Sequence, residues 1–372
     1  MSVIFKLMPM FISFNQKSII LGTALALIFA NLGVATAQSD TKEIAINFEG
    51  WVGDDRFECG NSYDRVGESE TTITPTDFRL YVSNVSLIDE HGNAVAVELE
   101  QDGKWQHQNV ALLDFEDGTG ACDNGTTETN TSIVGTVPEG DYQSLQFTLG
   151  VPERLNHDDA AIAPSPLNLT SMWWNWQGGY KFLRVDLETD SEIANVSSSS
   201  STYENQDGEN VQINQQSSTT QGGETTQTSS QTSIFKNGTG SHSQTSSTNR
   251  RGSHSQTSST HTSSDDHNQV SSNSYLIHLG STGCNDSAQS ELFGCANPNR
   301  SEIVLEDFNP EDNVVIVDLA ELLYESDLTT NDVNTAAGCM SSPEDADCNP
   351  ILQRLGLASS QTNDGQQFFF VE

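Results

Sequence analysis

Apolar and polar residues alternate along much of the chain. The alternation first appears at Ile44, Ile46 and Phe48, with Ala45 and Asn47 between them. A period of two, broken by spacers rich in glycine and asparagine, is typical of half-buried β-strands. Five later segments repeat the pattern, through Phe78, Leu80 and Val82; Leu145, Phe147 and Leu149; Leu183, Val185 and Leu187; Tyr275, Ile277 and Leu279; and Val315, Val317 and Leu319. We therefore expect an all-β fold, an antiparallel β-sandwich, with a barrel as the other arrangement that the pattern allows.

Helical patterns are short and lie near the C-terminus. The two best candidates are residues 318–324 and 350–355. No long amphipathic helix is predicted, so the helices are expected to add to a β fold and not to organise it.

The segment from 189 to 274 has a different composition. It consists of Ser, Thr, Gln, Asn and Gly with few large apolar residues, and it repeats GSHSQTSST at 240–248 and 252–260. Such a segment buries too little apolar surface to offset the entropy of ordering, so we expect a long disordered insertion. Its four histidines could bind metal weakly, although a solvated linker accounts for the composition alone: His242, His254, His261 and His267.

The insertion does not require two domains. Long surface insertions cost little stability, so the predicted strands on either side, 182–187 and 275–279, are expected to be neighbours in one sheet. We expect a single β domain over 38–372, interrupted by residues 189–274.

The first 37 residues read as a secretory signal peptide. Lys6 and Lys17 precede the apolar run 19–34, and Ala35-Thr36-Ala37 is a small-x-small cleavage pattern. An uncleaved N-terminal anchor is the alternative, and no later segment is apolar enough to span a bilayer. The mature protein is therefore expected to be periplasmic or secreted, with cleavage near Ala37.

The chain is strongly acidic, with a formal net charge of −37. Such a surface repels nucleic acid and anionic lipid, which excludes both as expected partners. It suits solubility in a salty habitat, or attraction of cations or a basic partner.

Six cysteines lie beyond the signal peptide: Cys59, Cys122, Cys284, Cys295, Cys339 and Cys348. An even number in an exported chain predicts disulfides. Sequence alone does not choose among the pairings, although short loops favour Cys284–Cys295 and Cys339–Cys348, which leaves Cys59–Cys122. Zinc binding is the rival interpretation, and the absence of a CxxC motif disfavours it.

The stretch MWWNWQGGYKF at 172–182 contains three of the five tryptophans. In an extended segment Trp174 and Trp176 share one face, and Trp173 takes the other. These indoles could close an open end of the sandwich. They could also stack on sugar, in a cell-surface adhesin or carbohydrate-binding module, or undergo oxidation. Composition does not rank the three possibilities.

His157 and His278 are the candidate metal ligands outside the insertion. His157 lies in a polar loop after a predicted strand, and His278 lies within a strand, where a buried imidazole needs partners. Two imidazoles with a soft or aromatic third group suit copper better than calcium or magnesium. Met172 offers a thioether, although core packing is the favoured role for it. No Ser-His-Asp order, phosphate-binding glycine loop or defined carboxylate pair is present, so no enzymatic activity is expected.

Several motifs together resemble the MbnP-like family of bacterial exported copper proteins. They are Leu155-Asn156-His157, Ser165-Pro166-Leu167-Asn168, the WxW motif of Trp174 and Trp176 followed by Gly179-Tyr180-Lys181-Phe182, His278-Leu279-Gly280-Ser281-Thr282-Gly283-Cys284, Gly294-Cys295-Ala296-Asn297-Pro298-Asn299-Arg300, and Gly338-Cys339 through Cys348. The resemblance spans most of the chain after the signal peptide. The insertion at 189–274 departs from the family pattern and alters the spacing between the WxW motif and His278.

The resemblance implies an exported, periplasmic copper-binding protein with a role in copper acquisition or homeostasis. It also implies a partner, a di-haem c-type peroxidase of the MauG and cytochrome c peroxidase type, which oxidises a WxW tryptophan to kynurenine. Carried over to this chain, Trp174 or Trp176 would be modified and His157 and His278 would hold copper.

Overall fold

The computed structural model describes residues 40–123, 125–175, 178–204, 210–219, 226–236, 239–248, 273–284, 294–332, 335–357 and 365–372. The predicted signal peptide, Trp176 and the second copy of the repeat at 252–260 lie outside the described residues.

Two sheets face each other as a β-sandwich, which confirms the predicted fold class. The smaller sheet has the order β24 (Phe369–Val371), β21 (Val314–Asp318), β1 (Thr41–Val52), β9 (Ser132–Pro138) and β6 (Glu98–Leu99), with β2 (Asp55–Arg56) beside β1. The larger sheet has the order β20 (Ser301–Glu306), β10 (Tyr142–Leu149), β4 (Thr71–Asp89), β12 (Gly179–Thr189), β17 (Ser274–Gly280) and β23 (Gly338–Cys339). Shorter strands join it at β4, β8 and β12, namely β3 (Tyr63–Val66), β5 (Ala94–Ala96), β7 (Gln106–His107), β8 (Val110–Asp114) and β11 (Trp173–Asn175).

The main core lies between these two sheets. All the alternating apolar residues that predicted the six strands are buried in it. The aromatic ring of Phe147 links the two sheets, because it packs edge-on against Phe48 of β1 at 6.0 Å and Phe369 of β24 at 5.1 Å between ring centroids. Burial of one face of each strand is the source of the period of two in the sequence.

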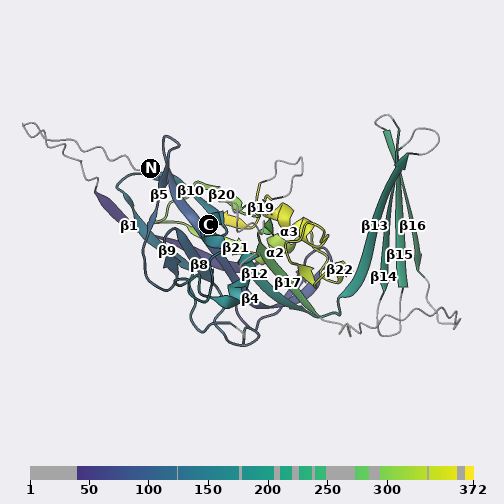
Figure 1. Ribbon diagram of the computed structural model, residues 1–372, viewed down its shortest axis with the longest axis horizontal. Helices are drawn as coiled ribbons and strands as arrows, with labels where there is room; N and C mark the ends of the chain where they lie inside the picture. Colours follow the sequence, from purple (N-terminus) through teal and green to yellow (C-terminus); the bar gives the residue numbers. More distant parts are fainter. Residues whose placement is uncertain are drawn as a thin grey trace, which may run out of the picture. The chain divides into compact units, whose positions relative to one another are not determined.

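The strands on either side of the insertion are neighbours, as predicted. β12 pairs with β17 and with β4, all antiparallel, and Figure 1 shows the three strands side by side. The end of β12 and the start of β17, which the insertion joins, therefore lie next to each other in one sheet.

Strands also occur within the insertion. β13 (Ala194–Glu204), β14 (Asn210–Thr219), β15 (Thr226–Lys236) and β16 (Thr239–Thr248) pair in sequence order, and β13 runs parallel to β22 (Thr330–Asp332). Disorder of the insertion in solution stays a prediction from its composition.

Short helices lie where the sequence predicted them. α2 (Leu319–Leu323) begins at Asp318, whose side chain caps it by accepting a hydrogen bond from the backbone N–H of Ala320 at 2.8 Å. α3 (Cys348–Arg354) overlaps the second predicted segment, 350–355, and begins two residues before it. No helix among the described residues is long and apolar enough to cross a membrane.

Three disulfides join all six cysteines, in the pairing that loop length favours. They are Cys59–Cys122, Cys284–Cys295 and Cys339–Cys348. The second disulfide connects β18 (Thr282–Cys284) to β19 (Cys295–Asn297), and the third ties the end of β23 to the start of α3. Because no thiolate remains among these cysteines, they do not form the rival zinc site.

Candidate metal centre

The outer face of the larger sheet carries a second cluster of buried apolar side chains. The cluster comprises Tyr81, Val110, Leu112, Val151, Leu155, Ala160, Leu167, Met172, Tyr180 and Phe182. Half of it comes from the segment 151–175, which includes α1 (Glu153–Asn156) and the 3₁₀ turn η1 (Thr170–Met172). Met172 is fully buried in this cluster, so its thioether serves packing.

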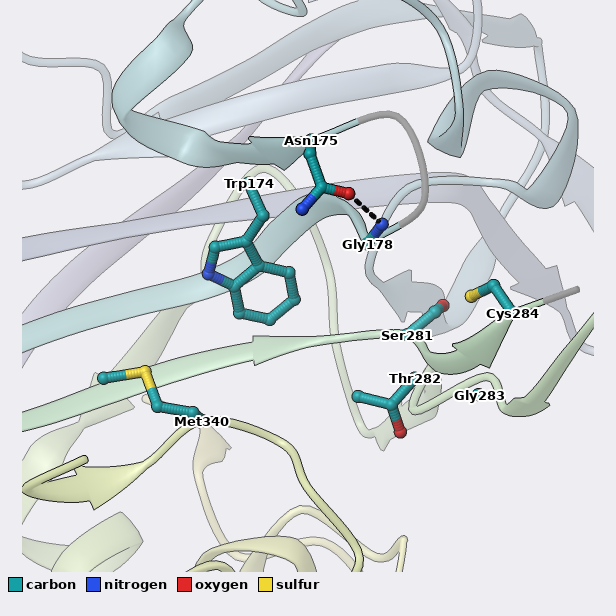
Figure 2. A pocket seen from close by; sticks show the side chains of 8 residues that line it. All are labelled: Trp174, Asn175, Gly178, Ser281, Thr282, Gly283, Cys284 and Met340. Carbon is teal, nitrogen blue, oxygen red and sulfur yellow. Dashed lines mark hydrogen bonds between the residues drawn. The ribbon is translucent and has the colours of Figure 1, made fainter. Parts of the chain in front are cut away.

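Trp173 and Trp174 lie on opposite faces of β11. Trp173 pairs with Tyr180 of β12, and its indole packs against the second cluster. Trp174, one residue later, points the other way and lines an open pocket (Figure 2). Asn175 fixes the turn that follows, because its Oδ1 accepts a hydrogen bond from the backbone N–H of Gly178 at 2.8 Å.

The Trp174 pocket has a volume of about 510 Å³ and is formed by β11, β18 and the residue after β23. Its lining residues are Trp174, Asn175, Gly178, Ser281, Thr282, Gly283, Cys284 and Met340. The indole lies directly over Gly280 at the end of β17. A Cβ at Gly280 would come within 2.5 Å of the Trp174 ring and 2.7 Å of the Tyr180 carbonyl oxygen, so only glycine permits this contact.

His278 lies on the same face of β17 as Gly280, because side chains two residues apart share a face of a strand. Its Nε2 is 2.7 Å from Oδ1 of Asp186 on the neighbouring strand β12, and the residue is 8 % exposed. Burial lowers the pKa of His278. Burial would raise the pKa of Asp186, but the hydrogen bonds from His278 and Arg184 outweigh it and lower that pKa to about 2.

The geometry shows which ring nitrogen faces Asp186. An ionised Asp186 only accepts hydrogen bonds, so Nε2 of His278 donates to it and Nδ1 is the ring nitrogen left for another partner. A carboxylate that orients a histidine in this way is the usual outer partner of a metal-binding imidazole.

The Asp186–His278 pair ends a row of buried and half-buried ionisable groups on β4, β12 and β17 and at the end of β8. Arg184 bonds Asp186 at 2.6 Å and Asp77 at 3.1 Å. Asp77 in turn accepts two hydrogen bonds from Arg79, whose guanidinium lies 3.7 Å from Glu116. We call these six residues and Asp114 the charged ladder: Asp77, Arg79, Asp114, Glu116, Arg184, Asp186 and His278. The ladder holds Asp186 in place from the side opposite His278.

Asp114 is the unbalanced member of the charged ladder. It is fully buried; its Oδ2 accepts a hydrogen bond from Thr126, and its Oδ1 has no partner among the described residues. Burial, reinforced by the nearby carboxylate of Glu116, raises its pKa to about 7. Lys181, opposite Gly280 in the register of β12 and β17, has its pKa lowered by burial to about 8.

His157 lies beside the Cys284–Cys295 disulfide. Its Nε2 is 3.6 Å from Sγ of Cys295 and 3.6 Å from a carboxylate oxygen of Glu153. Ligand atoms of His157, Cys284 and Cys295 lie within 4.8 Å of one another. Because the two sulfurs are bonded to each other, they offer no thiolate, and the imidazole is the candidate donor that this group retains.

Neither candidate histidine is among the residues that line the Trp174 pocket. Cys284 lines the pocket, and its disulfide partner Cys295 lies beside His157. His278 lies two residues before Gly280, over which the Trp174 indole lies. Within the described part of the chain, His278 is not a member of the three-residue group around His157. Each histidine is thus linked to the pocket through a neighbouring residue, and the two do not form one ligand group among the described residues.

Comparison with known families identifies the chain. The family model of MbnP matches residues 41–234, more than half of the sequence. This chain belongs to the MbnP family. The matched region contains His157 and Trp174 and ends before His278.

A solved structure supports the MbnP assignment across the remainder of the chain. The chain is similar to MbnP from Methylosinus trichosporium, with 25% sequence identity and a TM-score of 0.61, over 89% of this chain and 98% of that one. No curated protein matches the chain.

Sequence reasoning missed Met340 and, apart from His278, the charged ladder of this MbnP-family protein. The pairs Asp77-x-Arg79 and Arg184-x-Asp186 occupy the polar positions of alternating strands, which normally face water. The signal that could have revealed the charged ladder was the pair of opposite charges, two residues apart, in each of the two strands. Met340 follows a cysteine far along the chain, and no local pattern relates it to Trp174.

Proposed function

We propose that this protein is an exported copper-binding protein with a role in copper acquisition or homeostasis. The observation that carries the proposal is the Asp186-oriented imidazole of His278, on the strand face that ends beneath the Trp174 indole. His278 is the first candidate ligand, and His157 is the second. Membership of the MbnP family and the three disulfides are compatible with export to the periplasm or beyond.

The side chains around the pocket fit copper better than a hard cation. His278 presents a neutral nitrogen donor, and copper accepts imidazole readily, whereas calcium and magnesium require several oxygen ligands. The acids nearest His278 are already engaged, because Asp186 and Asp77 bond the two arginines of the charged ladder. Bound copper would supply a soft, redox-active centre beside an indole.

We further propose that Trp174 or Trp176 is oxidised to kynurenine by a partner di-haem c-type peroxidase. The resemblance of the WxW motif supports this step, together with the position of Trp174 on an open pocket. In this account the protein is the substrate of the peroxidase and has no catalytic activity of its own.

Removal of both candidate imidazoles is expected to abolish copper binding. Protein purified from a host with a copper supply should carry stoichiometric copper, and the His157→Ala, His278→Ala double variant should carry none. His91→Ala is the matched control, because His91 is an exposed histidine of a turn. Copper that persists in the double variant would overturn the site. Copper-free protein that binds glycans through Trp174 would favour a carbohydrate-binding module.

Co-expression with a di-haem peroxidase is expected to change one WxW-containing peptide. Kynurenine formation exchanges one ring carbon for oxygen, so the peptide should gain about 4 Da, and it must be sequenced because other oxidations add different masses. Trp174→Phe and Trp176→Phe variants assign the modified residue. An unchanged mass in the presence of active peroxidase would contradict the proposed modification.

A further inference from the structure

Met340 lies on the Trp174 pocket although it is remote in sequence. Figure 2 shows its thioether and the Trp174 indole as side chains of the same pocket. β23 runs parallel to β17 with Cys339 opposite Ile277, so the next residue, Met340, continues alongside His278. Topology therefore gathers Trp174, His278 and Met340 at one end of β17.

The backbone around Met340 is fixed at the positions that flank the site. The Ser341 hydroxyl donates to the carbonyl oxygen of His278 and accepts from the backbone N–H of Gly280, both at 2.8 Å. Ser341 adopts a φ of 65°, which is unfavourable for a residue other than glycine. On the other side, Cys339 is held by its disulfide to Cys348. Together these contacts set Met340 against β17.

Packing does not account for Met340. It belongs to neither of the two apolar clusters and is half-buried at the pocket, whereas Met172 is enclosed in the second cluster. A thioether is a soft donor that prefers Cu(I), and an imidazole binds either oxidation state of copper. The position of Met340 beside the oriented His278 therefore fits the role of a metal ligand better than that of a core residue.

We propose that Met340 is a thioether ligand of copper in the Trp174 pocket and makes the site selective for Cu(I). The inference rests on the proposed function, because it assigns a further donor to the same ion that His278 holds. Sδ of Met340 supplies a lone pair and no proton is exchanged. Cu(II) would depend on Met340 much less, since it favours nitrogen and oxygen donors.

The test compares Met340→Leu with Met172→Leu. Both changes replace sulfur by carbon at similar volume, which costs little stability. In competition with a chromophoric Cu(I) chelator, Met340→Leu is expected to weaken Cu(I) binding by at least about tenfold, as loss of even an outer partner of a metal does. Met172→Leu should bind Cu(I) as the unchanged protein does.

X-ray absorption at the copper edge provides a second measurement, without a substitution at Met340. The chain has five methionines, three of them in the predicted signal peptide. In a selenomethionine-labelled Met172→Leu protein without that peptide, Met340 is the one selenium site, and copper–selenium scattering is expected.

Two results separate the hypotheses. In the first, copper binding requires His278, but no copper–selenium scattering is seen and Met340→Leu binds Cu(I) with unchanged affinity. This result would overturn the Met340 assignment alone and would leave Met340 the role of a sulfur–aromatic neighbour of Trp174. Failure of the unchanged protein to bind copper in either oxidation state would overturn the proposed function and this inference with it.

Discussion

Replacement of Asp77 by Asn is expected to destabilise the fold by about 3–5 kcal/mol, the cost of removing one partner from a buried ion pair. Asp77 is buried between two arginines and accepts hydrogen bonds from Arg79. Its Oδ2 also lies 3.1 Å from Arg184. The isosteric amide keeps the volume but loses the charge, so the buried guanidinium of Arg79 and the half-buried one of Arg184 lose a shared carboxylate. Urea unfolding with intact disulfides measures the change.

Asp141→Asn is the control for this substitution, because Asp141 is exposed and its loss should change stability little. A change at Asp77 below about 1 kcal/mol would equal that of an exposed ion pair. Such a result would mean that water reaches the charged ladder and that the outer face of the larger sheet is open.

The unchanged protein is expected to lose stability as the pH rises from about 4 to about 7, and Asp114→Asn is expected to reduce this loss. Because burial raises the pKa of Asp114 from 3.8 to about 7, the folded protein holds a proton that the unfolded chain has lost in this window. Stability therefore decreases as the pH rises through it, by up to roughly 4 kcal/mol from this group alone. The neutral amide carries no such dependence, so the variant should gain relative stability at pH 8.

The measurement is the difference in unfolding free energy between the variant and the unchanged protein at each pH. Taking the difference cancels the shared contributions of other titrating groups, among them Asp186, whose lowered pKa makes stability fall as the pH drops towards 2, and His278. If the unfolding free energies of the variant and the unchanged protein run parallel from pH 4 to pH 8, Asp114 has the same pKa in the folded and the unfolded protein, which would contradict the prediction.

The inner face of the sandwich was predictable from the sequence. Phe147 and Val185 alternate with polar neighbours, and the burial of one strand face is a local property that repeats at every second residue. Capping by Asp318 and the short loops between cysteines are also local, so α2 and two disulfides could be predicted.

The outer face was not predictable in the same way. Arg79 and Arg184 occupy alternating polar positions, which indicate solvent, yet both lie in the charged ladder. Arg184 also donates to the carbonyl oxygen of Ser171, a residue of the 151–175 segment. Whether a polar strand face meets water or a covering segment depends on contacts distant in sequence, which periodicity does not record.

The candidate site shows the same limit. His278 and Trp174 could be selected by residue type and motif, but their soft neighbour could not. Met172, adjacent to the tryptophans in sequence, is enclosed in the second cluster, and Met340 reaches the pocket through the parallel pairing of β17 with β23. The function of Trp176, outside the described residues, stays a prediction.

Anomalous diffraction at the copper edge, from crystals of the copper-loaded protein, would locate the proposed copper ion. A single strong peak is expected beside Nδ1 of His278, at the end of β17 where Trp174 and Met340 border the pocket. A peak elsewhere, such as among the acids around Asp327 and Asp347 in a second pocket of about 490 Å³, or no peak in protein soaked with copper, would contradict the proposed site.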